Sequence, residues 1–239
     1  MWLKQNFLII FLIIINLTSK AQHALGLEAG FSEGQLITNI SNQASTVIHS
    51  ASGRHFGIGY KKEIKEWMYA DVRLSITDKN YSSNRIDSLS GVGTTYKNTY
   101  IQLPLMGGFI YGKKLRVLID AGLYGAYWLS GSVHGKIPNI FSAATSANQM
   151  GEIFQLQPFK EKYIFNPVKD NRFELGWIIG SGIQYHFNSN YIIDLNCRYY
   201  QSQTDQQKRY MVHQVARYNK VVTISAGVIF LLNTHYYKK

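Results

Sequence analysis

The feature that most constrains this chain is a long stretch, residues 99–130, in which apolar side chains recur at every second position. Ile101, Leu103 and Leu105 share one parity, and a Gly-Lys-Lys turn follows at residues 112–114. The same period then resumes in Leu115, Val117, Ile119, Ala121 and Leu123. This pattern predicts a β-hairpin with one apolar face and one face that carries charge and glycine. Such a hairpin fits a soluble sheet or the wall of a transmembrane barrel.

Six further segments repeat this alternation, so the sequence predicts eight strands. Besides the two strands of the hairpin they are residues 24–31, 54–61, 67–77, 172–187, 191–200 and 218–231. The predicted connections alternate between long polar loops (34–52, 78–95, 131–171 and 201–217) and short turns (62–66, 112–114 and 188–190). Outer-membrane barrels place short turns at one rim and long loops at the other, whereas a sandwich has no reason to sort its loops. The predicted fold is therefore all-β, an eight-stranded antiparallel up-and-down transmembrane β-barrel.

The N-terminal segment, residues 1–21, is typical of a secretory signal peptide. Lys4 precedes an apolar run at residues 7–15, which is too short to span a bilayer, and small residues end the segment at Ser19 and Ala21. The barrel domain is then expected over residues 22–239, in the outer membrane. A mean hydropathy of −0.14 is too polar for a bundle of membrane helices. Seventeen tyrosines and twenty glycines suit a barrel whose aromatic rings stand at the membrane interfaces.

The stretch YIQLPLMGGFI at residues 100–110, followed by DAGLYGAY at residues 120–127, resembles the outer-membrane β-barrel domain of PorT-like proteins of the Bacteroidetes. The resemblance covers nearly the whole mature chain and includes the strand at residues 176–185. It implies an eight-stranded barrel, in a family of mostly unknown role with one branch linked to gliding and protein secretion. The shared motif marks the fold and carries no chemistry. Pro104 lies inside this stretch, and a proline within a strand is expected to mark a β-bulge.

The parity opposite the apolar one collects five acids, four bases and one histidine. They are Glu28, Lys61, Asp71, Arg73, Arg116, Asp120, Glu174, His186, Asp194 and Arg198. An open ion-selective pore should carry an excess of one sign, whereas a matched set inside a narrow barrel should pair into a buried network. We therefore expect a plugged lumen that conducts little. The alternative is that some of these groups lie at the rims and are simply solvated.

The sequence gives little sign of catalysis. A lipid-modifying enzyme would need a Ser/His/acid set near the outer rim. The available bases are His55, His134, His186 and His213, and no Gly-x-Ser-x-Gly motif accompanies them. The histidines show no metal-ligand spacing with the single cysteine, Cys197. We expect no enzymatic activity, no cofactor, no metal site and, despite a net charge of +11, no nucleic-acid partner.

The predicted long loops hold the remaining candidates. Lys208, Arg209 and Arg217 are expected to meet the anionic head groups of lipopolysaccharide at the outer rim. Interface anchors are expected at Tyr60, Trp67, Tyr111, Tyr127, Trp128, Tyr185 and Phe187. The predicted role is structural or interaction-based through residues 131–171, as part of an envelope or secretion complex. The alternatives are a narrow pore for small solutes and, less favoured, a lipid-modifying enzyme.

Overall fold

The computed structural model describes residues 22–38, 46–86, 91–139, 155–212 and 214–232. The predicted leader, residues 1–21, and His213 lie outside the described residues. This part of the chain contains no helix long and apolar enough to cross a membrane. Its strands are β1 (Gln22–Thr38), β2 (Thr46–Lys65), β3 (Met68–Asp78), β4 (Asn80–Arg85), β5 (Gly93–Gly112), β6 (Leu115–Asn139), β7 (Gln155–Lys162), β8 (Phe173–His186), β9 (Tyr191–Ser202) and β10 (Arg217–Leu231).

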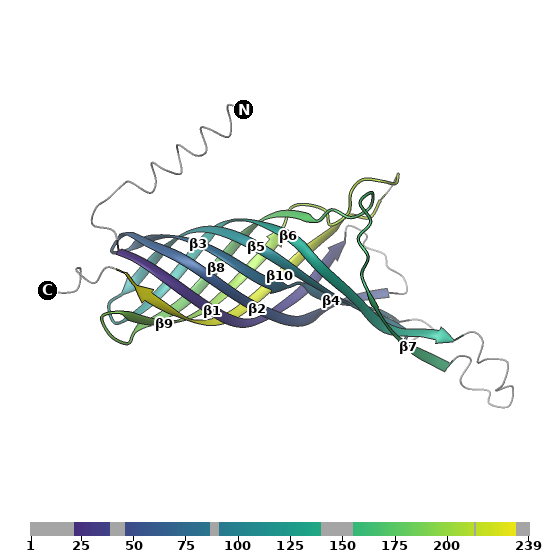
Figure 1. Ribbon diagram of the computed structural model, residues 1–239, viewed down its shortest axis with the longest axis horizontal. Coiled ribbons are helices and arrows are strands. Elements are labelled where there is room, and N and C mark those ends of the chain that lie inside the picture. The colour runs from purple at the N-terminus through teal and green to yellow at the C-terminus, as the bar shows by residue number, and fades with distance from the viewer. Residues whose placement is uncertain (1–21, 39–45, 87–90, 140–154, 213, 233–239) are drawn as a thin grey trace, which may run out of the picture.

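Eight of these strands, β1, β2, β3, β5, β6, β8, β9 and β10, form a closed antiparallel ring (Figure 1). Each pairs with the next strand of this set, and β10 returns to pair with β1. Leu27 of β1, for example, lies opposite Ile58 of β2 and Val228 of β10. Closure gives each strand a hydrogen-bonding neighbour on both sides, so the ring has no free edge. The predicted eight-stranded antiparallel barrel is confirmed.

Side chains alternate between the two faces of the barrel wall, as the sequence pattern predicted. In β8, Leu175, Trp177 and Ile179 are exposed on the outside, while Glu174 and Ile178 are buried inside. The barrel therefore has an apolar outer surface and an interior that holds most of its buried charged groups. This distribution is the reverse of that in a soluble protein and is typical of a barrel whose wall faces lipid.

The connections are sorted between the two ends of the barrel. At the short-turn end the chain reverses at residues 66–67, 113–114 and 187–190. Gly112 begins one of these turns with a φ of 115°, which residues with a Cβ rarely adopt. The start of β1 and the end of β10 also meet here, where the Leu232 N–H donates to the His23 carbonyl over 2.8 Å. The described strand ends that flank the longer connections lie at the other end, which we call the long-loop end.

The long loops predicted from the sequence are partly wrong, because the strands continue into them. β1 runs to Thr38 and β2 begins at Thr46, both inside the predicted loop 34–52. The predicted loop 78–95 contains β4, and the predicted loop 131–171 contains the end of β6 and all of β7. These segments are rich in Ser, Thr, Asn and charged residues, so they show no apolar alternation. Once the register is set in the wall, however, the backbone ladder can continue whichever side chains it carries.

The extra strands build a projection that we call the outer ribbon. It consists of β4, β7, the part of β5 before residue 98 and the part of β6 after residue 131. β4 pairs with both β2 and β5, and β7 pairs with the end of β6 over the register Ser132–Lys162 to Asn139–Gln155. In Figure 1 the ends of β6 and β7 extend farthest from the barrel. Within the described residues β7 pairs only with β6, and it carries Pro158, as edge strands often do.

Pro104 does not form the expected bulge. It faces the barrel interior opposite Tyr124, and the β3–β5 register on either side of it is unchanged, with Val72 opposite Leu105 and Ser75 opposite Gln102. The irregularity of β5 pairing lies instead at Thr99–Tyr100, where β6 contains one extra residue. A proline removes one donor from the ladder, and here the neighbouring pairs keep the two strands in register.

Candidate functional site: the charged lumen and the outer rim

The charged residues that the sequence assigned to the interior all lie inside the barrel. Each is at most 6% exposed, and they come from six strands: Glu28, Lys61, Asp71, Arg73, Arg116, Asp120, Glu174, Asp194 and Arg198. The strand alternation alone places them there, since each sits on the parity opposite the apolar one. His186, the histidine of the same set, is half-buried at the short-turn end of β8.

Glu28 is the centre of the interior network. Its carboxylate accepts hydrogen bonds from Arg73 of β3 and, at 2.9 Å, from Nη1 of Arg198 of β9. Nε2 of His55 lies 3.0 Å from the same carboxylate. Arg73 also donates to Asp71, with its Nη2 2.8 Å from Oδ2. This central layer joins β1, β2, β3 and β9, so it bridges the barrel from wall to wall.

Glycines on the facing strands leave room for these long side chains. Gly59 lies opposite Arg73 in the β2–β3 register, and a Cβ there would come within 2.9 Å of Cγ of Arg73. A Cβ at Gly180 would come within 2.4 Å of Oδ1 of Asp120 and 2.9 Å of Cγ of Arg198. The glycines on the polar parity thus make space for the charged layer, which explains why glycine and charge share that face in the sequence.

A second layer lies toward the long-loop end and is centred on Glu174. Its carboxylate accepts hydrogen bonds from Lys79, from the Tyr124 hydroxyl over 2.7 Å and from Nδ2 of Asn219 over 2.6 Å. The Lys79 ammonium also lies 4.8 Å from the ring centroids of both Tyr100 and Tyr124. Lys79 was not among the predicted interior residues, because it lies in the predicted polar loop 78–95. The alternation of Arg73, Ser75 and Thr77 into the interior, extended by one step, would have found it.

A third layer lies at the short-turn end. The Lys61 ammonium lies 3.7 Å from the ring centroid of Tyr69, and the hydroxyl of Tyr69 donates to Asp120 over 2.8 Å. Arg116 forms a 2.8 Å ion pair with Glu63, a partner that the sequence analysis assigned to a turn. Asp194 accepts a hydrogen bond from the neighbouring inward residue of its own strand, Asn196. The predicted charges are therefore held by aromatic and amide groups as well as by one another.

The long-loop end of the lumen is covered by an aromatic lid, residues 163–172. The ring of Tyr163 stacks on Trp128 at a centroid distance of 5.1 Å, and Phe165 meets the same indole edge-on at 4.9 Å. Trp128 in turn stacks on Tyr100 at 5.8 Å. The prediction that Trp128 anchors the outer surface is wrong, because it is only 4% exposed and points inward. Its parity matches that of Tyr124 and Ala126, and parity decides its direction.

Hydrogen bonds tie the lid to the neighbouring loop. The Tyr163 hydroxyl donates to Asp170 over 2.9 Å, and burial together with this bond raises the pKa of Tyr163 above its ordinary value. The Asn171 N–H donates to the Gln206 carbonyl, and Nε2 of Gln206 donates to the Tyr100 hydroxyl over 3.0 Å. The lid is thus anchored both to the loop between β9 and β10 and to the barrel interior.

One arrangement in the lumen has the composition of a catalytic triad. Nδ1 of His55 lies 2.8 Å from Oγ1 of Thr77, and its Nε2 faces Glu28. Both His55 and Thr77 are fully buried, and Thr77 also accepts a hydrogen bond from Gln102 over 2.9 Å. The three side chains link β1, β2 and β3 inside the barrel. Among the described residues no cluster of three His, Cys, Asp or Glu side chains could hold a metal ion.

Comparison with known proteins identifies the family. The family described as "Outer membrane protein beta-barrel domain" matches residues 17–208, most of the chain. The chain belongs to this outer-membrane β-barrel family. It is therefore an outer-membrane protein, and by the construction of such barrels its short-turn end faces the periplasm and its long-loop end the exterior.

Several solved outer-membrane protein structures are similar to this family member. They include Ail of Yersinia pestis (11% identity, TM-score 0.39, covering 87% of this chain and 99% of that one). OprG of Pseudomonas aeruginosa matches with 9% identity and a TM-score of 0.46, covering 88% of this chain and 96% of that one. Neisserial surface protein A matches with 14% identity and a TM-score of 0.40, covering 87% and 97%. No curated protein matches the chain.

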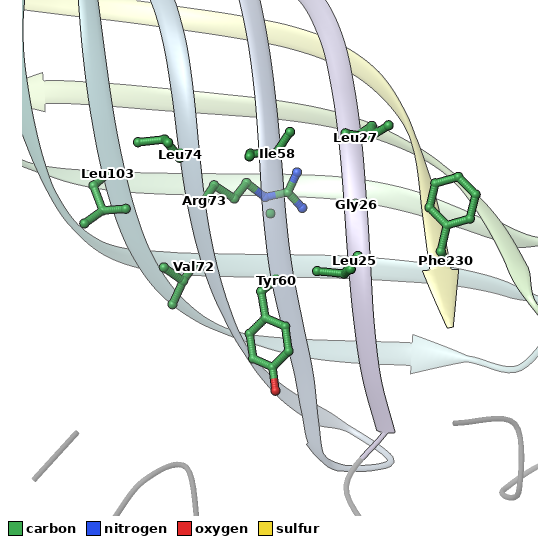
Figure 2. Close-up of a pocket in the computed structure, with 11 residues that line it drawn as sticks. Leu25, Gly26, Leu27, Ile58, Tyr60, Val72, Arg73, Leu74, Leu103 and Phe230 are labelled. Carbon is green, nitrogen blue, oxygen red and sulfur yellow. The ribbon is translucent and has the colours of Figure 1, made fainter. Parts of the chain in front are cut away.

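The lipid-facing wall of this outer-membrane barrel is apolar and slightly hollowed. A depression of about 510 Å³ lies across β1, β2 and β3, between rows of outward side chains (Figure 2). Leu25, Leu27, Ile58, Tyr60, Val72, Leu74, Leu103 and Phe230 surround it. Tyr60, a predicted interface anchor, lies at its periplasmic side. Two further predicted anchors, Tyr111 and Phe187, are exposed at other short turns of the barrel. The wall thus offers acyl chains a continuous apolar surface.

The predicted lipopolysaccharide contacts at the outer rim occupy different settings. Nζ of Lys208 donates to the Pro167 carbonyl over 2.8 Å, so it fastens the lid. Arg209 is exposed beside it. Arg217 is the first residue of β10, opposite Thr38 in the register. Within the described residues the structure shows no contact among these three side chains. Their role in lipid binding stays a prediction.

Proposed function

We propose that this outer-membrane barrel is a closed, non-enzymatic scaffold that engages a partner protein at the cell exterior. The observation that carries the proposal is the layered lumen, in which ion-paired, aromatic and lid layers follow one another along the barrel axis. Glu28 and Glu174 each bind partners from opposite walls. Breaking a buried ion pair leaves an uncompensated charge, so these layers resist the loosening that a conduction path would need.

The inner face of the outer ribbon, continuous with the lumen wall, supports a protein-binding role. Tyr81 of β4 stacks on Tyr96 of β5 at a centroid distance of 4.7 Å, and Val133 of β6 lies opposite Tyr96. Phe159 of β7 and Ile137 of β6 continue this face outward. Tyr81 is buried beneath this face, whereas Tyr96, Val133 and Phe159 are half-buried and Ile137 is exposed. Apolar side chains exposed in this way beyond the membrane are suited to binding another protein.

The resemblance to PorT-like proteins supports a narrower proposal about the partner. We propose that the barrel is a component of an envelope complex, and in the narrower form a secretion complex, in which the ribbon docks onto a neighbouring subunit. A closed lumen is consistent with such a role, because the barrel then supplies a rigid membrane anchor for the ribbon. A narrow pore for small solutes is the alternative that the sequence left open.

Conductance in planar bilayers tests the closed lumen. The wild-type protein should give no steady current, because Glu28, Arg73 and Arg198 meet across the centre of the lumen. The quadruple variant Glu28→Ala/Asp71→Ala/Arg73→Ala/Arg198→Ala removes the four ion-paired members of that layer together, and it should pass current. The control variant Glu63→Ala/Arg116→Ala removes an ion pair of the periplasmic layer only and should stay closed. A large steady current through the wild-type protein would favour the pore.

Crosslinking in intact cells tests the ribbon. Deleting residues 137–169 would also remove Tyr163 and Phe165 of the lid, so a shorter change is preferable. Gly135 lies opposite Phe159, and replacing residues 136–158 by Asn-Gly would close the hairpin with a two-residue turn. This variant should lose its crosslinked partner, while a control with Asn-Gly in place of residues 140–154 should keep it. Retention of the partner by the first variant would contradict the proposal.

A further inference from the structure

The other face of the outer ribbon, continuous with the lipid-facing wall, is cationic. In the register across β5, β6 and β7, Lys97 lies opposite Ser132, which lies opposite Lys162. In the next row outward, Thr95 lies opposite His134, which lies opposite Lys160. Lys136, opposite Pro158, follows one row later. We call Lys97, His134, Lys136, Lys160 and Lys162 the cationic face.

The direction of this face follows from the unbroken alternation of β5. Gln102, Tyr100 and Asn98 are buried inside the barrel, so Lys97 points outward with Ile101 and Leu103. In β6 the extra residue at Leu129 changes the parity, and the buried Gly131 and outward Ser132 follow it. Side chains opposite one another in an antiparallel pair lie on the same face. Lys97, Ser132 and Lys162 therefore all point outward.

The height of the cationic face matches the lipid head groups. Ile101 and Tyr127 form the last apolar row of the wall, and Thr99 and Ser130 form a neutral polar row above it. Lys97 lies four residues beyond Ile101, which in a tilted strand is about 10 Å farther from the bilayer centre. Head groups occupy roughly 5–8 Å beyond the hydrocarbon, and lysine side chains can reach back toward them.

Charge on this face is uncompensated. The three register rows that carry the cationic face contain no carboxylate among the described residues, and Glu161 lies on the opposite face, next to Val133. Four lysines on these three successive rows attract an anionic partner. A face of this sign, adjoining the outer leaflet of the outer membrane, is complementary to the phosphorylated sugars of lipopolysaccharide.

We propose that the cationic face binds the phosphate groups of lipopolysaccharide in the outer leaflet. Neighbouring strands are about 4.8 Å apart, so the Cα atoms of Lys97 and Lys162 flank Ser132 at roughly 10 Å from one another. A phosphate above Ser132 accepts hydrogen bonds from its hydroxyl and from both ammonium groups, while Lys160 and His134 contact the next anionic group. This site is separate from the predicted loop contacts Lys208, Arg209 and Arg217, and it depends neither on lumen closure nor on a protein partner.

Binding to purified lipopolysaccharide tests the proposal. The full mature chain, labelled at its single cysteine Cys197, is titrated in detergent with lipopolysaccharide and with its dephosphorylated form. The variant Lys97→Gln/Lys162→Gln removes two flanking charges from exposed positions, and two lysines near an anionic lipid predict about 30-fold weaker binding. The matched control Lys113→Gln/Lys114→Gln removes the same charge from an exposed periplasmic turn and should change the affinity less than twofold.

The affinity for lipopolysaccharide should fall only in the Lys97→Gln/Lys162→Gln variant, which we call the ribbon variant. Dephosphorylated lipopolysaccharide should bind the wild-type protein as weakly as intact lipopolysaccharide binds that variant. An unchanged affinity in the ribbon variant would overturn the proposal, as would an equal loss in the control. A loss seen only in Lys208→Gln/Arg209→Gln would move the site to the loop and also overturn it. Displacement of lipopolysaccharide by millimolar inorganic phosphate would overturn the assignment to the glycolipid.

Discussion

The barrel wall and the outer ribbon share β5 and β6, yet their two faces have opposite chemistry. In the wall, Leu103 and Leu123 point outward and Glu28 and Arg198 point inward. In the ribbon, Lys97 continues the outward face, while Tyr96 continues the inward face. The difference teaches that the surrounding medium selects the side chains. Lipid requires an apolar exterior within the bilayer, and water with anionic head groups permits a cationic one above it.

The largest expected effect comes from comparing two inward-face carboxylates. Glu28→Ala should lower the free energy of unfolding by about 3–5 kcal/mol, because it leaves Arg73 and Arg198 buried without their shared partner. Glu161→Ala, on the exposed inward face of the ribbon, should change it by less than about 0.5 kcal/mol. Urea unfolding in lipid vesicles measures both. Equal losses would mean that the buried layer contributes nothing special to the barrel.

A comparison of the two outward faces should give the next largest effect. Leu123 is 69% exposed on the lipid-facing wall, opposite Leu105. Leu123→Arg should cost about 2–4 kcal/mol of folding free energy, because a charge near the bilayer centre is poorly solvated. Lys97→Leu should change the stability by only about 0.5 kcal/mol, because that side chain lies outside the hydrocarbon. If both substitutions cost the same in vesicles, the ribbon lies in the bilayer and the comparison fails.

Glycine substitutions sharpen the same contrast inside the wall. Gly180→Ala should destabilise the barrel by about 1–3 kcal/mol, because the new methyl group would overlap Asp120 and Arg198. Gly125→Ala is the matched control on the lipid-facing side, where the nearest atom, Cδ2 of Leu175, lies 3.7 Å away. It should be nearly neutral in the same unfolding assay. A neutral Gly180→Ala would show that the charged layer can shift, which would weaken the case for a closed lumen.

The smallest expected effect concerns the lid, at the junction between wall and ribbon. Tyr163→Phe removes the hydrogen bond to Asp170 and should favour local opening of residues 163–172 by about 1 kcal/mol. Hydrogen exchange of the lid amides should therefore be about fivefold faster, since exchange follows the opening equilibrium. Tyr111→Phe at an exposed periplasmic turn should leave those amides unchanged. Unchanged lid exchange in Tyr163→Phe would show that ring stacking alone holds the lid.

Much of the candidate site was predictable from alternation, although its partners were not. Period two places Glu28, Arg73 and Arg198 in the interior, because a strand has only two faces. It does not say which strands face each other across a closed ring, so the contact between Glu28 of β1 and Arg198 of β9 had to come from the structure. The same holds for Glu63, which lies in a predicted turn, whereas Lys79 continues the inward alternation of β3 by one step.

The sequence by itself determined the barrel, because eight alternating segments with sorted connections have few other ways to bury one face and expose the other. Only the tertiary structure decided what lies beyond the wall. One extra residue at Leu129 reverses the parity of β6, so that Ser132, His134 and Lys136 face outward, whereas simple alternation from Trp128 would turn them inward. A local register shift of this kind depends on the neighbouring strand, and a pattern read along one strand cannot contain it.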